Sequence, residues 1–383
     1  MTDAAVVGRI LREYHEAAVE PAGIRRLAGS VRGTRVTYHL GSPAGPGLVV
    51  RALRTDVPLA GQFGGGTMAA TDWLCGRAAT LRWLEDRAYP APRVIRTHSG
   101  DLVGLAGVWA TLATTYVAGT PLRPDVGQLR LLGEALGRLH ALDATAFADE
   151  TSAMGPGAAH PGTAGAGAGD VAGVRGVAGS GDVAGAALVR ALWHPETAIP
   201  AALGRVEAVQ SLVPADQRPL LEQLRAVLLE VQRRASLLPT AVVHGDPWPG
   251  NAIRTARDEV TLIDWENAGL GVPLLDLGYC LLECHLDARL PGENPSARHI
   301  RPDEDRIVAV AAGYSQCRRL QPAERDLLPD GMRFAAAFAG ATHFEQALIG
   351  GVRGAPMDAR LERLRNRLAV SDSVAELARR HFD

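Results

Sequence analysis

The feature that constrains this chain most is a pair of short apolar runs, each ending in oxygen-bearing side chains. The first run, Val242-Val243, stops at His244-Gly245-Asp246, and a loop with two prolines and a glycine then supplies Asn251. The second run, Val260 to Ile263, delivers Asp264. Apolar runs bounded by turn residues predict strands, and too few residues separate these two for a helix of ordinary length. Because loops between strands often carry catalytic groups, we expect an active site here.

The three polar side chains suit metal-assisted chemistry. A carboxylate can accept or orient a proton, and the oxygens of Asn and Asp are hard ligands of the kind that Mg²⁺ prefers. We therefore predict that Asp246 handles a proton while Asn251 and Asp264 hold a magnesium ion.

Length, charge and cysteine content narrow the function classes. At 383 residues the chain is too long for one small core, which favours two lobes. A formal net charge of -2 provides no basic field for nucleic acid or an anionic membrane. Four cysteines make no disulfide framework in so long a chain, and no apolar run is long enough to span a bilayer. The first residues lack the apolar core of a signal peptide, so we expect a cytoplasmic protein.

The basic residues are all of one type. The sequence contains no lysine, so each of its 40 Lys+Arg positions is an arginine. Together with the excess of Ala and Gly, this suggests a compositional bias of the source genome. Any role that lysine usually plays must therefore fall to arginine in this chain.

Residues 1–117 predict a small β-rich lobe with one long helix. Strand patterns occupy 27–38, which a turn of small residues divides, and then 48–53, 94–95, 102–108 and 111–117, while a helix pattern covers 71–87. The turn from Gly29 to Thr34, which includes Ser30, can fold over a phosphate because small residues let backbone N–H groups approach an anion. A plain hairpin turn is the competing interpretation.

Residues 118–383 predict a mainly helical second lobe, which makes the whole chain α+β. Helix patterns lie at 129–140, 220–231, 273–284, 304–320, 324–349 and 359–380. The stretch from about 155 to 187 is rich in Gly and Ala and lacks apolar periodicity, so we expect a flexible insert. Cys280, Cys284 and His285 have no second ligand pair at suitable spacing, which favours an apolar helix over a metal site.

The order of the motifs resembles one superfamily. His-Gly-Asp-x-x-x-x-Asn at 244–251, Ile-Asp-Trp-Glu at 263–266 and Asp276-Leu277 follow a β-rich lobe and a helix that ends in Gly137-Arg138-Leu139-His140. This set resembles the aminoglycoside phosphotransferase and choline kinase branch of the protein-kinase-like fold, over about residues 27 to 350. The resemblance implies a two-lobe kinase that transfers the γ-phosphate of ATP or GTP, with Mg²⁺, to a hydroxyl group.

The resemblance also implies roles around the catalytic loop. Asp246 would orient the acceptor hydroxyl or accept its proton, and Asn251 and Asp264 would hold the Mg²⁺ that bridges the triphosphate. His244 and Asp276 would brace the loop from behind without touching the substrate.

The nucleotide end follows the family pattern less closely. Thr115-Tyr116-Val117 stands where the hinge lies, so the Thr115 carbonyl and the Val117 N–H would meet the base. Arg51 occupies the strand position of the usual phosphate-clamping lysine, and Arg77 aligns with its usual glutamate partner. Two arginines would repel, so either the alignment shifts, another acid such as Asp72 serves, or both arginines contact the phosphates.

The acceptor remains open at this level. Polar residues beyond the catalytic loop that can meet a cation or a hydroxyl are Glu266, Glu283, His285, His343 and Glu345, although surface solvation explains most of them equally well. A small molecule such as an antibiotic, a sugar or an amino alcohol is the first expectation. A Ser or Thr of a biosynthetic peptide is the second. A nucleotide-binding pseudokinase is the third: Arg51 and Arg77 favour it, and the intact Asp246 opposes it.

Overall fold

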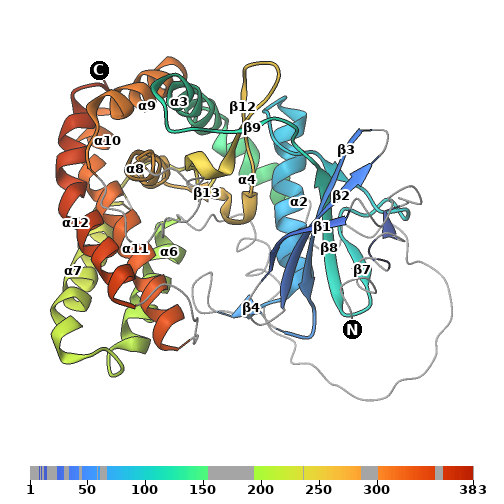
Figure 1. The fold of residues 1–383 in the computed structure, drawn as a ribbon. Helices are drawn as coiled ribbons and strands as arrows, with labels where there is room; N and C mark the ends of the chain where they lie inside the picture. The colour runs from blue at the N-terminus through green and yellow to red at the C-terminus, as the bar shows by residue number, and fades with distance from the viewer. Residues whose placement is uncertain are drawn as a thin grey trace.

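The chain forms a β-rich lobe and a larger helical lobe, which lie side by side in Figure 1. The computed structural model describes residues 8, 10, 13–14, 24–29, 34–42, 45–57, 59–60, 67–153, 194–235, 237–285, 301–349 and 357–382. Ser30, the predicted insert at 155–187 and the segment 286–300 lie outside these ranges. Of the helices within them, none combines the length and apolar character that crossing a membrane requires. The α+β fold class predicted from the sequence, with a β-rich first lobe and a mainly helical second lobe, is confirmed.

An antiparallel sheet forms the first lobe, in the order β1-β2-β3-β8-β6 with β7 paired to β8. Its strands are β1 (Ile24–Gly29), β2 (Arg35–Ser42), β3 (Gly45–Arg54), β6 (Val94–Ile95), β7 (Gly104–Ala106) and β8 (Trp109–Thr115). The strand predicted at 102–108 is shorter because Gly107, at φ +68°, turns the chain. A separate two-stranded ladder joins β4 (Leu59–Ala60) to β5 (Thr67–Met68).

The two faces of this sheet have different surroundings. Side chains alternate between faces along a strand, so Tyr38, Val50 and Ala113, which are partners across β2, β3 and β8, lie in the same buried cluster. The intervening residues Arg51 and Leu112 face a cavity beside helix α2 (Ala70–Asp86). The sheet therefore presents one arginine-bearing face to the space between the lobes.

Helices make up most of the second lobe. They are α3 (Val126–His140), α4 (Ala144–Ala153), α6 (Pro195–Val209), α7 (Arg218–Ala235), α8 (Pro273–Glu283), α9 (Glu304–Cys317), α10 (Pro322–Asp326), α11 (Leu328–Leu348) and α12 (Met357–Arg379), with a short 3₁₀ turn at η2 (Ala215–Gln217). The sequence did not indicate α4 or α6. The single helix predicted at 324–349 is two helices. Pro329 has no backbone N–H with which to continue the helix from α10, so a second helix begins at Leu328.

Helices α3 and α9 pack closely through small residues. A Cβ on Gly133 would lie 2.1 Å from the Val310 carbonyl oxygen, and one on Gly313 would lie 1.9 Å from the Arg130 carbonyl oxygen. Only glycine allows this approach of two backbones. The contact fixes the C-terminal end of α3, and with it His140, relative to α9.

Two small ladders place the predicted site between the lobes. Strand β10 (Ala241–Val243) pairs with β13 (Gly269–Gly271), whereas β12 (Val260–Leu262) pairs with β11 (Ala252–Arg254), which in turn pairs with β9 (Thr120–Pro121). Both strands predicted around the His-Gly-Asp motif are thus present, in different ladders. The 3₁₀ turns η3 (Pro249–Asn251) and η4 (Trp265–Asn267) follow directly after the two polar ends.

Candidate active site

The loop after β10 has a backbone that only glycine permits. Gly245 lies at φ +82°, and a Cβ there would come within 2.4 Å of the Asn267 carbonyl oxygen. Asp276, at the start of α8 and fully buried, accepts hydrogen bonds from the N–H groups of His244 (to Oδ2, 2.9 Å) and Gly245 (to Oδ1, 2.9 Å). The Asp276 carboxylate thus holds two consecutive backbone amides and fixes the backbone immediately before Asp246.

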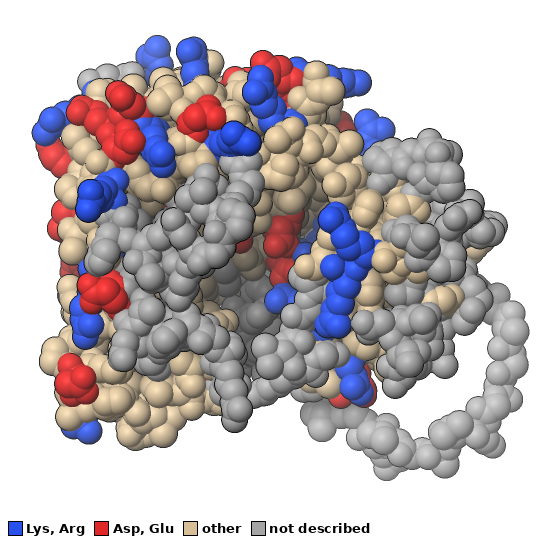
Figure 2. Space-filling view, viewed as in Figure 1, with Lys and Arg blue, Asp and Glu red and all other residues tan. Residues whose placement is uncertain are grey.

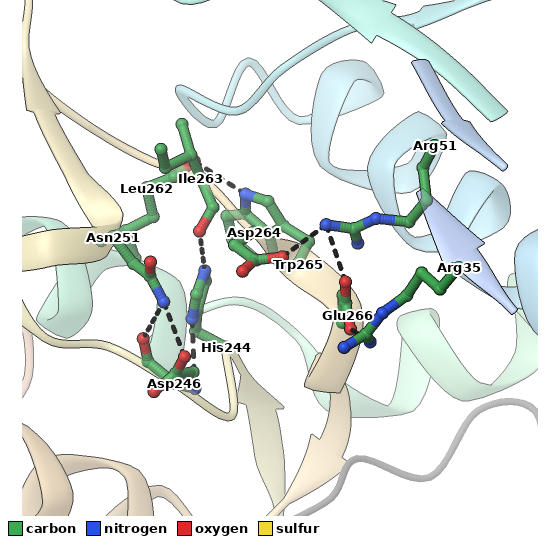
Figure 3. A network of polar contacts seen from close by, with 10 residues as sticks. All are labelled: Arg35, Arg51, His244, Asp246, Asn251, Leu262, Ile263, Asp264, Trp265 and Glu266. Carbon is green, nitrogen blue, oxygen red and sulfur yellow. Dashed lines mark hydrogen bonds and ion pairs between the residues drawn. The ribbon is translucent and has the colours of Figure 1, made fainter. Parts of the chain in front are cut away.

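His244 joins the loop to the second motif. Its Nδ1 accepts from the Asp246 N–H (3.2 Å), so the ring proton resides on Nε2, which donates to the Ile263 carbonyl (2.9 Å). Burial lowers the pKa of His244, although the Asp276 and Asp264 carboxylates oppose that shift, so the ring is neutral. The neutral tautomer ties the two strand ends together, as Figure 3 shows.

A buried chain of polar contacts extends from Asp276 into the helical lobe. His140 of α3 contacts Asp276 Oδ2 through Nε2 (3.1 Å) and Tyr314 of α9 through Nδ1 (3.0 Å). Arg318 donates to the Tyr314 hydroxyl (2.9 Å) and to the fully buried Glu324 (2.7 Å). His140 is therefore a packed, hydrogen-bonded residue, and the loop is anchored to three helices.

Asp246 is held on both sides. Asn251 donates from Nδ2 to Asp246 Oδ2 (2.7 Å) and to the Asp246 carbonyl (3.1 Å), and Tyr279 of α8 forms a hydrogen bond with the same carboxyl group. Burial raises the pKa of Asp246 to about 8; Tyr279 and Asn251 lower it, and the charges of Asp264 and Glu283 raise it. Sequence reasoning missed Tyr279, which stands one turn after Asp276 on an otherwise apolar helix.

The two predicted metal ligands line the same cavity. Both Asn251 and Asp264 line it, and because Asn251 uses its Nδ2 on Asp246, its Oδ1 is the atom left for a ligand. Asp264 has the left-handed conformation (φ 65°, ψ 55°), and its side chain is 42% exposed. Within the ranges that the structure describes, no cluster of three or more His, Cys, Asp or Glu forms a self-contained metal cage. Two hard oxygens fit Mg²⁺ that completes its shell with water and phosphate oxygens.

The cavity extends from these residues to the predicted hinge. Its volume is about 320 Å³, and apolar side chains from both lobes line it, among them Val49, Leu112 and Ile253. The Tyr116 N–H donates to the Gly47 carbonyl of β3 (3.1 Å). Because backbone groups alternate in direction along an extended chain, the flanking Thr115 carbonyl and Val117 N–H point away from β3. Both residues line the cavity, which makes them available to the edge of a base.

The two arginines predicted to repel each other are each compensated. Arg51 contacts Asp264 and Glu266, both at 2.7 Å, so the acid beside it comes from the second motif rather than from Asp72. Despite burial, which lowers it, these carboxylates raise the pKa of Arg51 above its ordinary value. Arg77 of α2 is buried and donates to the Ala268 carbonyl. Burial lowers the pKa of Arg77 to about 10, although Glu266 opposes the shift.

Four of the five residues predicted to meet the acceptor have separate surroundings. Glu266 contacts the first lobe through Arg51 and through Arg35 of β2 (2.6 Å), not the helices beyond Asp276. Glu283 is buried and paired with Arg367 of α12, and Glu345 pairs with Arg205 of α6 (3.0 Å). His343 lies half-buried on α11. Sequence reasoning missed Arg35, Arg205 and Arg367, which lie at least 84 residues from their partners and carry no local signal.

Comparisons with known proteins agree with this architecture. Residues 77–321 match the model of a family described as "Phosphotransferase enzyme family". A homoserine kinase of Hyphomonas neptunium is 24% identical over 247 residues, which are 64% of this chain and 62% of that relative. The chain thus matches less than two thirds of that relative's length.

Solved structures show the same fold at low identity. An amicoumacin kinase, solved in complex with AMP-PNP, Ca²⁺ and "Ami", is 15% identical with a TM-score of 0.63 over 97% of this chain and 94% of its own. A choline/ethanolamine kinase family protein of Mesorhizobium loti is 18% identical, with a TM-score of 0.54 over 100% and 99% of the two chains. Since the family model covers most of the chain, including the catalytic loop, this protein belongs to the phosphotransferase enzyme family.

Proposed function

We propose that this protein is a Mg²⁺-dependent kinase that transfers the γ-phosphate of ATP to a hydroxyl group of a small molecule. The observation that carries the proposal is that Asn251, Asp264 and the Thr115–Val117 segment line one cavity, while Asp246 is hydrogen-bonded to Asn251. A nucleotide base at the backbone end would direct its phosphates towards the carboxylates. The amicoumacin kinase of the same fold was solved with AMP-PNP, which supports a nucleotide there.

Each residue then has a distinct task. The Thr115 carbonyl and Val117 N–H receive the base, and the apolar walls formed by Val49 and Ile253 enclose it. Asn251 and Asp264 would hold Mg²⁺, which neutralises and orients the phosphate oxygens when bound. Arg51, which lines the same cavity and contacts Asp264, adds positive charge beside the phosphates.

Asp246 acts on the acceptor. Its carboxylate accepts a hydrogen bond from the incoming hydroxyl and aligns the oxygen with the γ-phosphate, taking the proton as the new P–O bond forms and the bond to ADP breaks. Tyr279 and Asn251 hold that carboxylate in a single orientation. Asp276 fixes the loop from behind through the two amides.

The acceptor we propose is a small molecule without several positive charges. The similar proteins include a homoserine kinase, an amicoumacin kinase and a choline/ethanolamine kinase family protein, whose names all denote small acceptors. Glu283 and Glu345 are each neutralised by an arginine, so the described part of the acceptor side does not present an acidic surface for a polycation.

The test is a transfer assay with the purified full chain. Labelled ATP and Mg²⁺ are incubated with panels of antibiotics, amino alcohols, sugars and peptides, with Asp246→Asn as the matched inactive variant. We expect label on a small-molecule hydroxyl, and a loss of about 10²–10⁴-fold in kcat for Asp246→Asn with ATP still bound. Label on peptide serine or threonine alone would favour the peptide kinase, and ATP binding without transfer would favour the pseudokinase. Unchanged turnover in Asp246→Asn would remove that residue from the mechanism.

A further inference from the structure

One carboxylate joins the arginines of the nucleotide end. Glu266 extends one oxygen to Arg51 of β3 (Oε1, 2.7 Å) and the other to Arg35 of β2 (Oε2, 2.6 Å), as Figure 3 shows. Its side chain is only 16% exposed, and it stands on η4, two residues after the predicted metal ligand Asp264. The contacts span 215 and 231 positions of sequence and connect the sheet of one lobe to the other lobe.

Helix α2, which lies beside the sheet, does not supply the acid that contacts Arg51. Arg77, on the buried face of α2, lines the same cavity as Arg51 and carries the same charge. It donates to the carbonyl of Ala268, two residues after Glu266, so the helix is attached to the segment that bears the carboxylate. Arg35 and Arg51 therefore contact Glu266 directly, while Arg77 is attached to the backbone two residues after it.

The second contact of Arg51 is of a different kind. Arg51 Nη2 also reaches Asp264 Oδ1 at 2.7 Å, yet the Asp264 carboxylate is needed for a metal in the proposed function. Glu266 has no such competing task, so it can hold Arg51 whether or not nucleotide is bound. Acidic side chains lie deep in the hollow between the lobes, beside arginines of the first lobe (Figure 2).

We propose that Glu266 is the positioning residue of the phosphate-binding end, which holds Arg51 in the cavity where a triphosphate would lie, with Arg35 fixing its second oxygen. The inference rests on the proposed function for the location of the nucleotide. Glu266 would then hold the arginine of β3 in position, which is the task that an acid on α2 would otherwise perform. A planar arginine head needs such a fixed partner because its fork binds phosphate only in a defined orientation.

Equilibrium binding of ATP and of adenosine to the full chain, with Mg²⁺, separates this role from the alternatives. In Glu266→Gln the amide keeps the shape but loses the charge, so Arg51 is no longer held. We expect ATP to bind about 10–100-fold more weakly and adenosine to bind within about 2-fold of the wild type. If Glu266 only neutralised the arginines, removing its charge would tighten ATP binding, which is the opposite direction.

Two further variants keep the test decisive. Arg35→Gln removes a half-exposed side chain that acts through Glu266, so it should weaken ATP binding by a smaller factor, about 3–10-fold, and leave adenosine unchanged. Glu150→Gln breaks a pair of similar length, Arg87–Glu150 at 2.6 Å, away from the cavity, and should change neither ligand. Thermal melting of each variant checks that it is folded.

The outcomes of these binding experiments are distinct from those of the transfer assay that tests the proposed kinase activity. ATP binding as tight as in the wild type in both Glu266→Gln and Arg35→Gln would overturn the inference, as would an equal loss of ATP and adenosine. If Glu266→Gln does not fold, Arg35→Gln decides alone. The binding experiment needs no acceptor. A failure to find transfer activity would therefore count against the proposed function, but the binding result could still be interpreted.

Discussion

Asp276→Asn tests whether one buried carboxylate holds the catalytic loop. Asp276 is fully buried and accepts from the amides of His244 and Gly245 at 2.9 Å each, and it also contacts His140. The substitution keeps the volume but turns one acceptor oxygen into an NH₂ group, which then faces a donor. Each hydrogen bond to a charged group contributes about 1.5–3 kcal/mol, and an opposed buried donor adds a penalty. We therefore expect the free energy of unfolding to fall by about 3–5 kcal/mol.

Denaturant unfolding measures that loss, and hydrogen exchange locates it. The amides of His244 and Gly245 should exchange at least about 10-fold faster in Asp276→Asn, while amides of the sheet keep their protection. The control is Asp303→Asn, which keeps a helix cap that accepts from the Arg306 N–H at 3.2 Å and removes only a half-exposed ion pair, so it should cost less than about 1 kcal/mol. A change below about 1 kcal/mol in Asp276→Asn, with unaltered exchange, would refute the reasoning.

The glycine and histidine of this framework give two further predictions. Gly245→Ala should reduce transfer activity at least about 10-fold, because its Cβ would meet the Asn267 carbonyl, whereas Gly100→Ala, at a similar φ of +89° but in open space, should leave activity unchanged. Equal effects would contradict the steric argument. Burial lowers the pKa of His140, so the unfolded chain, with a pKa near 6.5, binds the proton first as the pH falls. Stability should decrease below about pH 6.5, less steeply in His140→Gln when followed by denaturant midpoints.

The local chemistry of the loop could be predicted because it is encoded within a few residues. Asp246 and Asn251 contact each other across five positions, and the intervening turn closes through its own prolines and glycine. The apolar runs on either side predict strands that stop where the polar residues begin. The kinase-like fold followed from the order of these motifs, and the family model and the solved structures confirm it.

Other elements left no readable pattern. Helices α4 and α6 were missed because they carry few large apolar residues at helical spacing, and α6 contains Pro200, which is a helix breaker. The break at Leu327 between α10 and α11 was missed although Pro329 marks it, because apolar residues continue on either side. Helix formation in these segments depends on burial against neighbouring helices, which propensity alone does not capture.

The sequence by itself predicted the loop from His244 to Asn251 as the catalytic loop and Asn251 and Asp264 as metal ligands, and it fixed that position 51 is an arginine. Only the tertiary structure decided what that arginine does. Arg51 has Arg77 on the neighbouring helix, and the carboxylates that compensate it, Asp264 and Glu266, lie 213 and 215 positions away. An ion pair depends on where two side chains meet in space, and folding brings these together by joining the lobes. Spacing along the chain therefore identifies the residues of the loop, whereas the charge balance of the nucleotide end exists only in the folded molecule.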